Sequence, residues 1–260
     1  ILHAAKAGCD NIIVGLGGSS TNDGGCGAAA ACGVRFINDS GESFVPVGET
    51  LQQIAHIDIT NLAPELKQIN ITTMCDIDNP LCGPKGAAKI FAPQKGATPE
   101  IVEMLDEGLK HLAAIIKQDL GKDVLEIPGS GAAGGMGAGM VAFFNSQLQP
   151  GIETVLNTAK FNDIIQDADI IFTGEGCFDE QSLMGKVISG ITKRAKKADI
   201  PVICVAGSLD KIPPKAYEMG LTAAFSINQK PIPFAEAAPL SEESLRQTMQ
   251  NILRLLKLQA

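Results

Sequence analysis

The stretch from Gly15 to Gly25 constrains the fold of this chain more than any other feature of its sequence. It reads GLGGSSTNDGG, directly follows the apolar run from Asn11 to Val14, and precedes an alanine-rich segment. This order predicts a buried strand over 11–18, a glycine-rich turn, and a helix of small residues over 23–32. Such a turn can hold an anion, because glycines let the backbone approach closely and the first N–H groups of a helix point outward.

The residues of this stretch also allow a purely structural interpretation. A glycine-rich turn can serve only to let a strand and a helix pack closely, and this one matches neither the P-loop nor the dinucleotide-binding spacing. If the turn binds an anion, its candidate binding residues supply backbone N–H groups or short polar side chains. These residues are Gly17, Gly18, Ser19, Ser20, Thr21 and Asn22.

The composition excludes several classes of function. The 260 residues carry a formal net charge of −8 and 4% aromatic residues, with no Trp, so no nucleic-acid partner is expected. No apolar run approaches the roughly 18 residues that span a bilayer, so no membrane partner is expected either. Seven scattered cysteines without a C-x-x-C pair indicate reduced thiols and a cytoplasmic protein. The chain opens at Ile1 inside a helical pattern, and we expect the natural protein to begin further upstream.

Two carboxylates follow a β-rich run in the first half of the chain. Ile71 to Ile77 reads ITTMCDI, and Asp76 and Asp78 stand at its end, before an Asn-Pro turn. Open α/β sheets bind ligands at the carboxyl ends of their strands, so both residues are candidates for holding a metal ion. They can equally terminate the strand as an Asx turn. The glycine- and proline-containing segment that follows carries three candidates for recruiting an anion: Lys85, Lys89 and Lys95.

The second glycine cluster runs from Pro128 to Met140 and reads PGSGAAGGMGAGM. Its first glycines match G-x-G-x-x-G, but Pro128 interrupts any preceding strand and no acidic residue follows at the required distance. The pattern therefore fails the context of a dinucleotide-binding fold. We expect a loop and a small-residue helix against which a ligand or another backbone lies closely. Its candidate binding residues are Gly131, Gly134 and Gly135.

Alternating strand and helix patterns predict an α/β protein. Thr98 and Pro99 begin the clearest helix, which runs to Leu120. In the second half, strands are predicted over 170–173, 201–206 and 223–227, and helices over 179–198 and 242–258. This alternation is typical of a parallel sheet. A three-stranded open sheet is a poor core by itself, so we expect further strands to complete it.

The third cluster, Thr173 to Lys186, reads TGEGCFDEQSLMGK and leaves a predicted strand with several polar groups. A carboxylate here can bind Mg²⁺ or accept a proton from a hydroxyl, and a lysine can neutralise a transferring phosphoryl group. Alternatively, Asp179 caps a helix and Lys186 is a surface charge. We favour the functional interpretation, because the strand-end position and the polar groups coincide. The candidate catalytic residues are Asp179, Lys186 and Glu175, and the candidate binding residues are Gln181 and Ser182.

These three clusters, with CDIDNPLCGPKGAAKIFAPQKGATPE and PVICVAGS, resemble the bacterial glycerate kinase family of the class I glycerate 2-kinase type. The five motifs stand in one order along nearly the whole chain. The resemblance implies two α/β domains, one flavodoxin-like and the other a mixed α/β domain inserted in it. We expect 1–165 to form the inserted domain and 166–260 to form the C-terminal part of the flavodoxin-like domain. Its parallel sheet would be completed by an N-terminal segment that this chain lacks.

The resemblance also implies an activity, the ATP- and Mg²⁺-dependent phosphorylation of D-glycerate, with 2-phosphoglycerate as the favoured product. In this hypothesis the glycine loops hold phosphates, Asp76 or Asp78 holds Mg²⁺, and Asp179 is the base for the glycerate hydroxyl. Lys186 would stabilise charge on the transferred group, and Cys177 stands where relatives usually carry an arginine. We expect a monomer or homodimer. The alternatives are an NAD-dependent oxidoreductase that uses the second glycine loop, or a truncated, non-catalytic fragment that binds a nucleotide or an organic acid.

Overall fold

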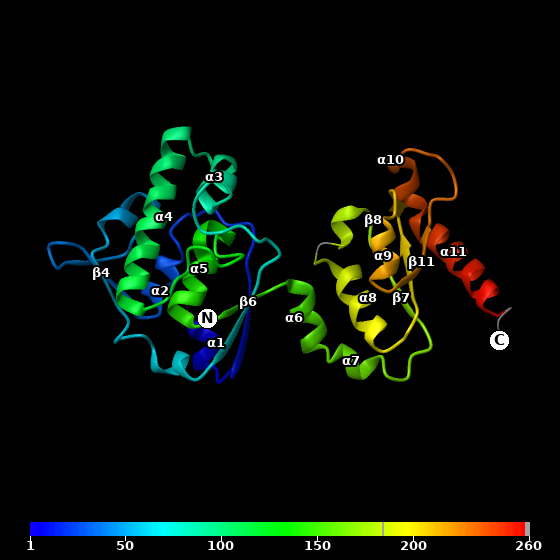
Figure 1. The fold of residues 1–260 in the computed structure, drawn as a ribbon, viewed down its shortest axis with the longest axis horizontal. Coiled ribbons are helices and arrows are strands. Elements are labelled where there is room, and N and C mark those ends of the chain that lie inside the picture. Colours follow the sequence, from blue (N-terminus) through cyan, green and yellow to red (C-terminus); the bar gives the residue numbers. More distant parts are fainter. Residues whose placement is uncertain (184, 258–260) are drawn as a thin grey trace. The chain divides into compact units, whose positions relative to one another are not determined.

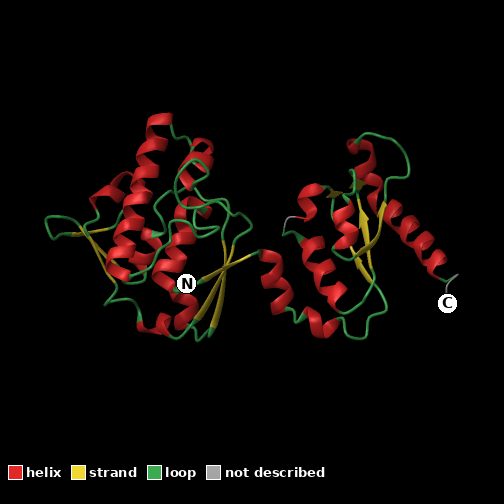
Figure 2. Cartoon of the chain, viewed as in Figure 1, coloured by secondary structure: helices red, strands yellow, loops and turns green. Residues whose placement is uncertain are grey.

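The computed structural model of the chain describes residues 1–183 and 185–257 and divides into two compact units, Ile1–Gly151 and Ile152–Ala260 (Figure 1). Each unit combines helices with strands (Figure 2), which confirms the predicted mixed α/β fold. None of the described helices combines the length and the apolar character that a bilayer crossing requires. The domain boundary expected between residues 165 and 166 refers to the inserted domain and the flavodoxin-like domain that the family resemblance implies. It stays a prediction.

A three-stranded parallel sheet supports the first unit. β1 (Asn11–Gly15) pairs with β5 (Asn70–Met74), which pairs with β6 (Gln147–Gln149). The buried strand predicted over 11–18 is wrong in its length and its burial, because β1 ends at Gly15 and Ile13 is 46% exposed. In the register of β1 with β5, Gly15 lies opposite Met74, so β1 and β5 end at the same edge of the sheet. The first glycine stretch and the segment with Asp76 therefore both leave the sheet at its carboxyl edge, where α/β proteins bind ligands.

The longest helix of the first unit, α4 (Pro99–Leu120), has the predicted bounds. Its first turn is capped by Thr98, whose Oγ1 accepts the N–H of Ile101 at 3.4 Å, and the left-handed Gly121 ends it. The antiparallel sheet of this unit has the order β3-β2-β4. The remaining helices and strands are α1 (Leu2–Lys6), α2 (Cys26–Ala31), α3 (Ala87–Phe91), α5 (Ala132–Phe144), β2 (Arg35–Ile37), β3 (Ser43–Phe44) and β4 (His56–Asp58).

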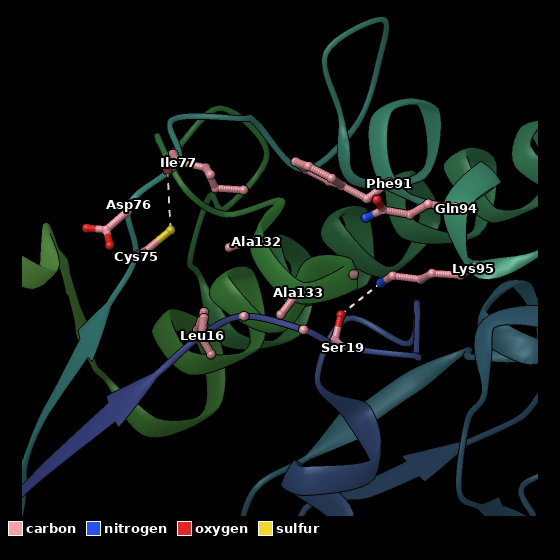
Figure 3. A pocket seen from close by; sticks show the side chains of 13 residues that line it. Leu16, Ser19, Cys75, Asp76, Ile77, Phe91, Gln94, Lys95, Ala132 and Ala133 are labelled. Atoms are coloured by element: carbon pink, nitrogen blue, oxygen red, sulfur yellow. Dashed lines mark hydrogen bonds between the residues drawn. The ribbon is translucent and has the colours of Figure 1, made fainter. Parts of the chain in front are cut away.

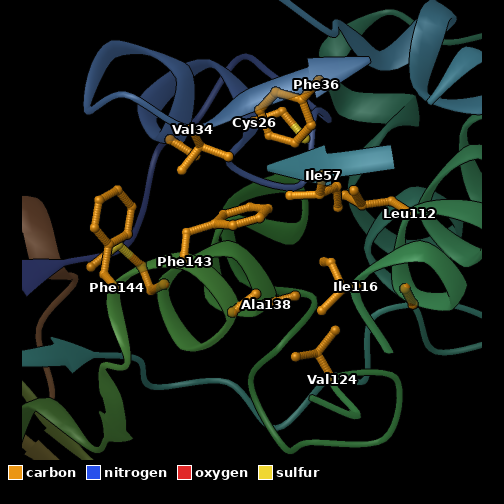
Figure 4. Close-up of a cluster of buried hydrophobic side chains, with 14 of the residues drawn as sticks. Cys26, Val34, Phe36, Ile57, Leu112, Ile116, Val124, Ala138, Phe143 and Phe144 are labelled. Carbon is orange, nitrogen blue, oxygen red and sulfur yellow. The ribbon is translucent and has the colours of Figure 1, made fainter. Parts of the chain in front are cut away.

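The core of the first unit lies between β2, α4 and α5 (Figure 4). The rings of Phe36 and Phe143 meet edge to face, with centroids 5.7 Å apart, a favoured aromatic geometry. Buried aliphatic side chains surround them, among them Val34, Ile57, Leu112, Ile116 and Ala138. Every residue of this cluster comes from the first unit, so its loops stand on a core of their own.

The two glycine-rich stretches of the first unit pack backbone against backbone. The carbonyl oxygen of Gly134 accepts the N–H of Gly24 at 3.1 Å, and a Cβ on Gly134 would lie 2.0 Å from the carbonyl oxygen of Thr21. Ala133, Gly134 and Gly135 have φ values of 52°, 70° and 88°, so three consecutive residues are left-handed before the regular part of α5 begins. This bend turns the start of α5 toward the first glycine stretch.

The second unit contains the parallel sheet that the alternation predicts, in the order β11-β9-β7. Its strands are β7 (Ile171–Thr173), β9 (Val202–Ala206) and β11 (Leu221–Ser226). On one face, Ile252 of α11 (Ser241–Leu256) packs against Ile203 and Val205. The other elements are α6 (Gly151–Thr158), α7 (Phe161–Ile164), α8 (Val187–Lys197), α9 (Pro214–Glu218), α10 (Phe234–Ala237), β8 (Cys177–Phe178) and β10 (Ser208–Leu209).

The helix predicted over 179–198 is wrong in its first part, because α8 begins at Val187. A single 3₁₀ turn covers Glu180–Leu183 instead. Asp179 Oδ1 accepts hydrogen bonds from the N–H and the hydroxyl of Ser182, and the Ser182 hydroxyl oxygen accepts the N–H of Asp179. Such local side-chain bonds compete with helical hydrogen bonding and close a separate turn.

The close approach at Gly134 leads to a prediction about stability. A methyl group at this position meets backbone atoms that cannot move aside, so Gly134→Ala should lower the free energy of unfolding. Gly18→Ala is the matched control, because Gly18 also has a positive φ, of +59°, but a Cβ there meets nothing within 4 Å. We expect Gly134→Ala to cost about 1–3 kcal/mol more than the control, measured by urea unfolding followed by circular dichroism. Equal losses in the two variants would contradict this account.

Candidate functional site

A pocket of about 230 Å³ in the first unit joins segments that the sequence analysis treated separately (Figure 3). We call it the glycine pocket. The residues after β1, the residues after β5 and the start of α5 meet there, as expected for the carboxyl edge of a parallel sheet. It is lined by Leu16, Gly17, Gly18, Ser19, Cys75, Asp76, Ile77, Phe91, Gln94, Lys95, Ala132, Ala133 and Gly134.

Lys95 is the one cation among the residues that line the glycine pocket. Its Nζ donates to Ser19 Oγ at 2.8 Å (Figure 3). It also donates to the carbonyl oxygen of Thr21 at 2.7 Å, so two hydrogen bonds connect Lys95 to the first glycine stretch. Burial lowers the pKa of Lys95, and the nearby carboxylate of Asp23 partly opposes that change. A partly desolvated ammonium group interacts strongly with phosphate or carboxylate oxygens, so Lys95 is the clearest candidate for an anion contact in the pocket.

Asp76 is the one anion in the same lining. Its Oδ1 accepts the N–H of Gly151 at 2.8 Å, which holds the carboxylate just beyond the end of β5. Its Oδ2 makes no hydrogen bond to any described residue. Asp78 is exposed and lies outside the lining. Of the two carboxylates predicted to hold a metal ion, the structure therefore brings Asp76 to the pocket.

The first glycine stretch does not offer the start of a helix to a ligand, in contrast to the expectation from the sequence. α2 begins only at Cys26 and has six residues. The two carboxylate oxygens of Asp23 accept the N–H groups of Gly25 and Gly27, each at 3.0 Å. These donors are therefore already satisfied. Any anion at this stretch depends on the loop of Gly17–Ser19 and on Lys95.

A second cavity of about 370 Å³ shares Lys95 with the glycine pocket, so this lysine lines both cavities. We call it the aliphatic pocket. Three predicted binding residues, Ser20, Thr21 and Asn22, line it rather than the glycine pocket. Asn22 is 8% exposed, and neither polar atom of its amide has a hydrogen-bond partner among the described residues. The other lining residues are Asp23, Val47, Gly48, Ala92, Gly96, Ala97, Ile101 and Leu105.

Gly131 and Gly135 line neither cavity. A Cβ on Gly131 would lie 2.2 Å from the carbonyl oxygen of Pro80, and one on Gly135 would lie 3.0 Å from the Cα of Gly24. Both glycines thus permit close packing of backbone segments. Of the three predicted binding glycines in the second cluster, Gly134 is the one that lines the glycine pocket.

The third cluster belongs to the second unit and contains two different carboxylates. Asp179 is hydrogen-bonded to Ser182 as described above, which is the capping geometry. Glu175 Oε1 is buried without a hydrogen-bond partner among the described residues. Burial, together with the negative charge of Glu175, raises the pKa of Cys204 to about 11. Lys186 is exposed and directly precedes α8, and the side chain of Gln181 lies outside the described part of the structure.

The sequence did not distinguish Lys95 from the other two candidate lysines, Lys85 and Lys89. The structure separates the three lysines: Lys89 pairs with Glu103, and Lys85 is exposed and outside both pocket linings. Phe91 and Gln94, which also line the glycine pocket, carry no pattern that indicates a site. The sequence signal that could have found them is the composition of their segment, which contains lysines, glycines and prolines and precedes the predicted helix that begins at Pro99.

Comparison with known proteins identifies the family. Residues 1–257 match the family model described as the glycerate kinase family. The chain belongs to the glycerate kinase family. A glycerate kinase of Bacillus cereus is 48% identical over 258 residues, which are 99% of this chain and 68% of the relative. The glycerate 2-kinase of Escherichia coli is 44% identical over 227 residues, 87% of this chain and 60% of the relative.

A solved structure agrees with this family assignment. The crystal structure of a putative glycerate kinase 2 from Salmonella typhimurium LT2 matches this glycerate kinase family chain with a TM-score of 0.85 and 42% identity. The match covers 98% of this chain and 67% of that one. The chain spans about two thirds of the length of the curated relatives it matches. The family that the sequence motifs indicated is confirmed.

The position of Lys95 generates a prediction about anion binding. Lys95→Met keeps the length of the side chain but removes the ammonium group from the glycine pocket. The Kd of inorganic triphosphate, measured by titration calorimetry, should rise about 10- to 100-fold, since a hydrogen bond to a charged group contributes about 1.5–3 kcal/mol. Lys85→Met is the control for the loss of one positive charge. Equal affinities in both variants would remove Lys95 from the site.

The cysteines give a second prediction, which tests burial in both units. Cys9 and Cys177 are exposed, whereas burial raises the pKa of Cys26, Cys32, Cys75, Cys82 and Cys204. A raised pKa lowers the fraction of reactive thiolate at pH 8. A disulfide reagent should therefore modify two of the seven thiols quickly in the folded chain and the other five only after unfolding. Rapid modification of a third thiol would show that its surroundings open readily.

Proposed function

We propose that this protein transfers the terminal phosphoryl group of ATP to D-glycerate, with 2-phosphoglycerate as the product. The observation that carries the proposal is the glycine pocket, where Lys95 and the backbone of Gly17–Ser19 face the same space as Asp76. Two of the relatives are named glycerate kinase and glycerate 2-kinase. Phosphoryl transfer needs little covalent chemistry from the protein, so positioned donors and charges of this kind can support it.

The size and charge of the glycine pocket suit the small, anionic reactants of this reaction. Glycerate has a carboxylate, two hydroxyl groups and almost no apolar surface. In the proposed reaction a glycerate hydroxyl oxygen forms a bond to the terminal phosphorus atom, the bond from that atom to the bridging oxygen breaks, and ADP leaves. The hydroxyl proton passes to a carboxylate. Lys95 would hold phosphate oxygens by charge-assisted hydrogen bonds.

The residues at the pocket fit a magnesium ion that is bound largely by the nucleotide. The described residues contain no group of three or more His, Cys, Asp or Glu side chains that could hold a metal ion. Mg²⁺ is commonly bound by one or two carboxylates together with substrate phosphates and water, so a dedicated protein cage is not needed. Asp76 has one carboxylate oxygen available for this purpose. When bound, Mg²⁺ would neutralise charge on the phosphate oxygens.

The carboxylates of the second unit are the proposed proton acceptors. Asp179 remains the preferred base, and Glu175, with its unpartnered oxygen, is the second candidate. Lys186 is proposed to stabilise charge on the transferred group, and Gln181 to contact substrate. Ser182 is fully buried and bonded to Asp179, so its proposed part is to hold Asp179 in place.

Substitution of Asp179 separates a catalytic role from a capping role. Asp179→Asn removes the basic carboxylate but keeps an oxygen that can accept the hydrogen bonds from Ser182. If Asp179 is the base, kcat for ADP release in the presence of D-glycerate should fall at least about a hundredfold, without loss of thermal stability. Glu175→Gln is the parallel variant. Near-normal turnover of Asp179→Asn would leave Asp179 with the capping role and move the proton to another group.

Measurements of ligand binding and turnover distinguish the kinase from the two alternatives, an oxidoreductase and a non-catalytic binding fragment. ATP binding with ADP release that depends on D-glycerate supports the kinase. Binding of NADH without binding of ATP would favour an oxidoreductase. Binding of ATP or glycerate without turnover would indicate a non-catalytic binding fragment.

A further inference from the structure

The proposed phosphoryl transfer leaves the aliphatic pocket without a role. Its walls carry two exposed aliphatic side chains, Val47 (54% exposed) and Ile101 (41% exposed), beside the more buried Leu105. The cavity volume of about 370 Å³ lies within the usual range of small-molecule sites. When a ligand covers apolar side chains that are accessible inside a concave site, the burial of their surface stabilises the complex. The walls therefore indicate a ligand with an apolar face.

Glycerate and phosphate groups do not meet this requirement. Both are small and charged and have almost no apolar surface to place against Val47 and Ile101. Among the described residues that line the aliphatic pocket, Lys95 is the one cation, and it stands at the border with the glycine pocket. The carboxylate of Asp23 is held by the N–H groups of Gly25 and Gly27. The interior is thus suited to a neutral, largely apolar group.

The amide of Asn22 adds a capacity for hydrogen bonding to this lining. Its Nδ2 and Oδ1 are both buried without partners among the described residues, and each unpaired buried group costs about 1–3 kcal/mol. Such a cost calls for an explanation in a native protein. The terminal torsion of an asparagine side chain is soft, so the amide can turn toward a ligand. It then offers one donor and one acceptor side by side.

We propose that the aliphatic pocket binds the purine base of the nucleotide, and that the phosphate chain passes Lys95 into the glycine pocket. A purine has two apolar faces for the aliphatic walls and an edge that carries donors and acceptors. An asparagine amide can bond the edge of adenine through a donor and an acceptor together. Lys95 lines both cavities. The ribose that joins the base to the phosphates would therefore lie near Lys95. This inference rests on the proposed function, since it assigns the nucleoside part of the same nucleotide.

Two polar substitutions test the pocket without adding charge. The double variant Val47→Gln/Ile101→Gln removes apolar contact area from exposed side chains, so the fold should be retained. Ile90→Gln is the matched control, because Ile90 is 46% exposed on a helix and lies outside both pocket linings. We expect the double variant to raise the Kd of ATP about tenfold through lost apolar burial, measured by titration calorimetry. The control should bind ATP as the unmodified chain does.

Inorganic triphosphate is the probe that separates the base from the phosphates. It has no base, so its Kd should be the same in the double variant, the control and the unmodified chain. Asn22→Leu, which keeps the size of the side chain but removes its polar atoms, should reduce the preference for ATP over GTP. Unchanged ATP affinity in the double variant would overturn the assignment of the base and leave the kinase standing wherever ADP release continues. If the unmodified chain binds triphosphate but no nucleotide, the base site and the proposed function both fail.

Discussion

The backbone contact between Gly24 and Gly134 is the constraint on which the rest of the site depends. It holds the loop after β1 against the bend that begins α5, and the glycine pocket lies beside this contact. The bend requires three left-handed residues in succession, one of them Ala133, and an alanine in that conformation costs about 1–2 kcal/mol. The packed core around Phe36 and Phe143 supports this arrangement. The geometry of the pocket thus comes from main-chain packing, with few side chains to adjust.

The electrostatics of the site are local. A chain with a formal net charge of −8 does not attract anions through its overall field. Lys95 provides positive charge at the point where it is needed, and its hydrogen bonds to Ser19 and Thr21 fix its position. Asp23 neutralises the start of α2, so the helix contributes little to anion binding. The proposed recognition of a phosphate therefore depends on a few placed donors.

Local signals in the sequence predicted the elements with the clearest patterns, and tertiary contacts account for much of what it did not predict. Thr98, Pro99 and the apolar spacing that follows determined both ends of α4, and the glycine motifs predicted the loops that meet at the pocket. The helix expected from Asp179 onward was wrong, because one pair of side chains closes a separate turn. Lys95 could not be distinguished from Lys85 by composition. Val47 and Ile101 come together in one pocket lining only after the chain has folded, and no sequence pattern marked either residue as part of a site.

The position of Lys95 between two cavities has a thermodynamic consequence. An anionic ligand group that bonds the Lys95 ammonium group from one cavity would change the electrostatic surroundings of the other cavity, which would couple the occupation of the two. Such coupling is reciprocal: if one ligand changes the affinity for the second by some factor, the second changes the affinity for the first by the same factor. A molecule that fills both cavities at once also avoids the entropy of bringing two separate ligands together. A composite ligand that fills both cavities therefore has a single ammonium group at the junction of its parts.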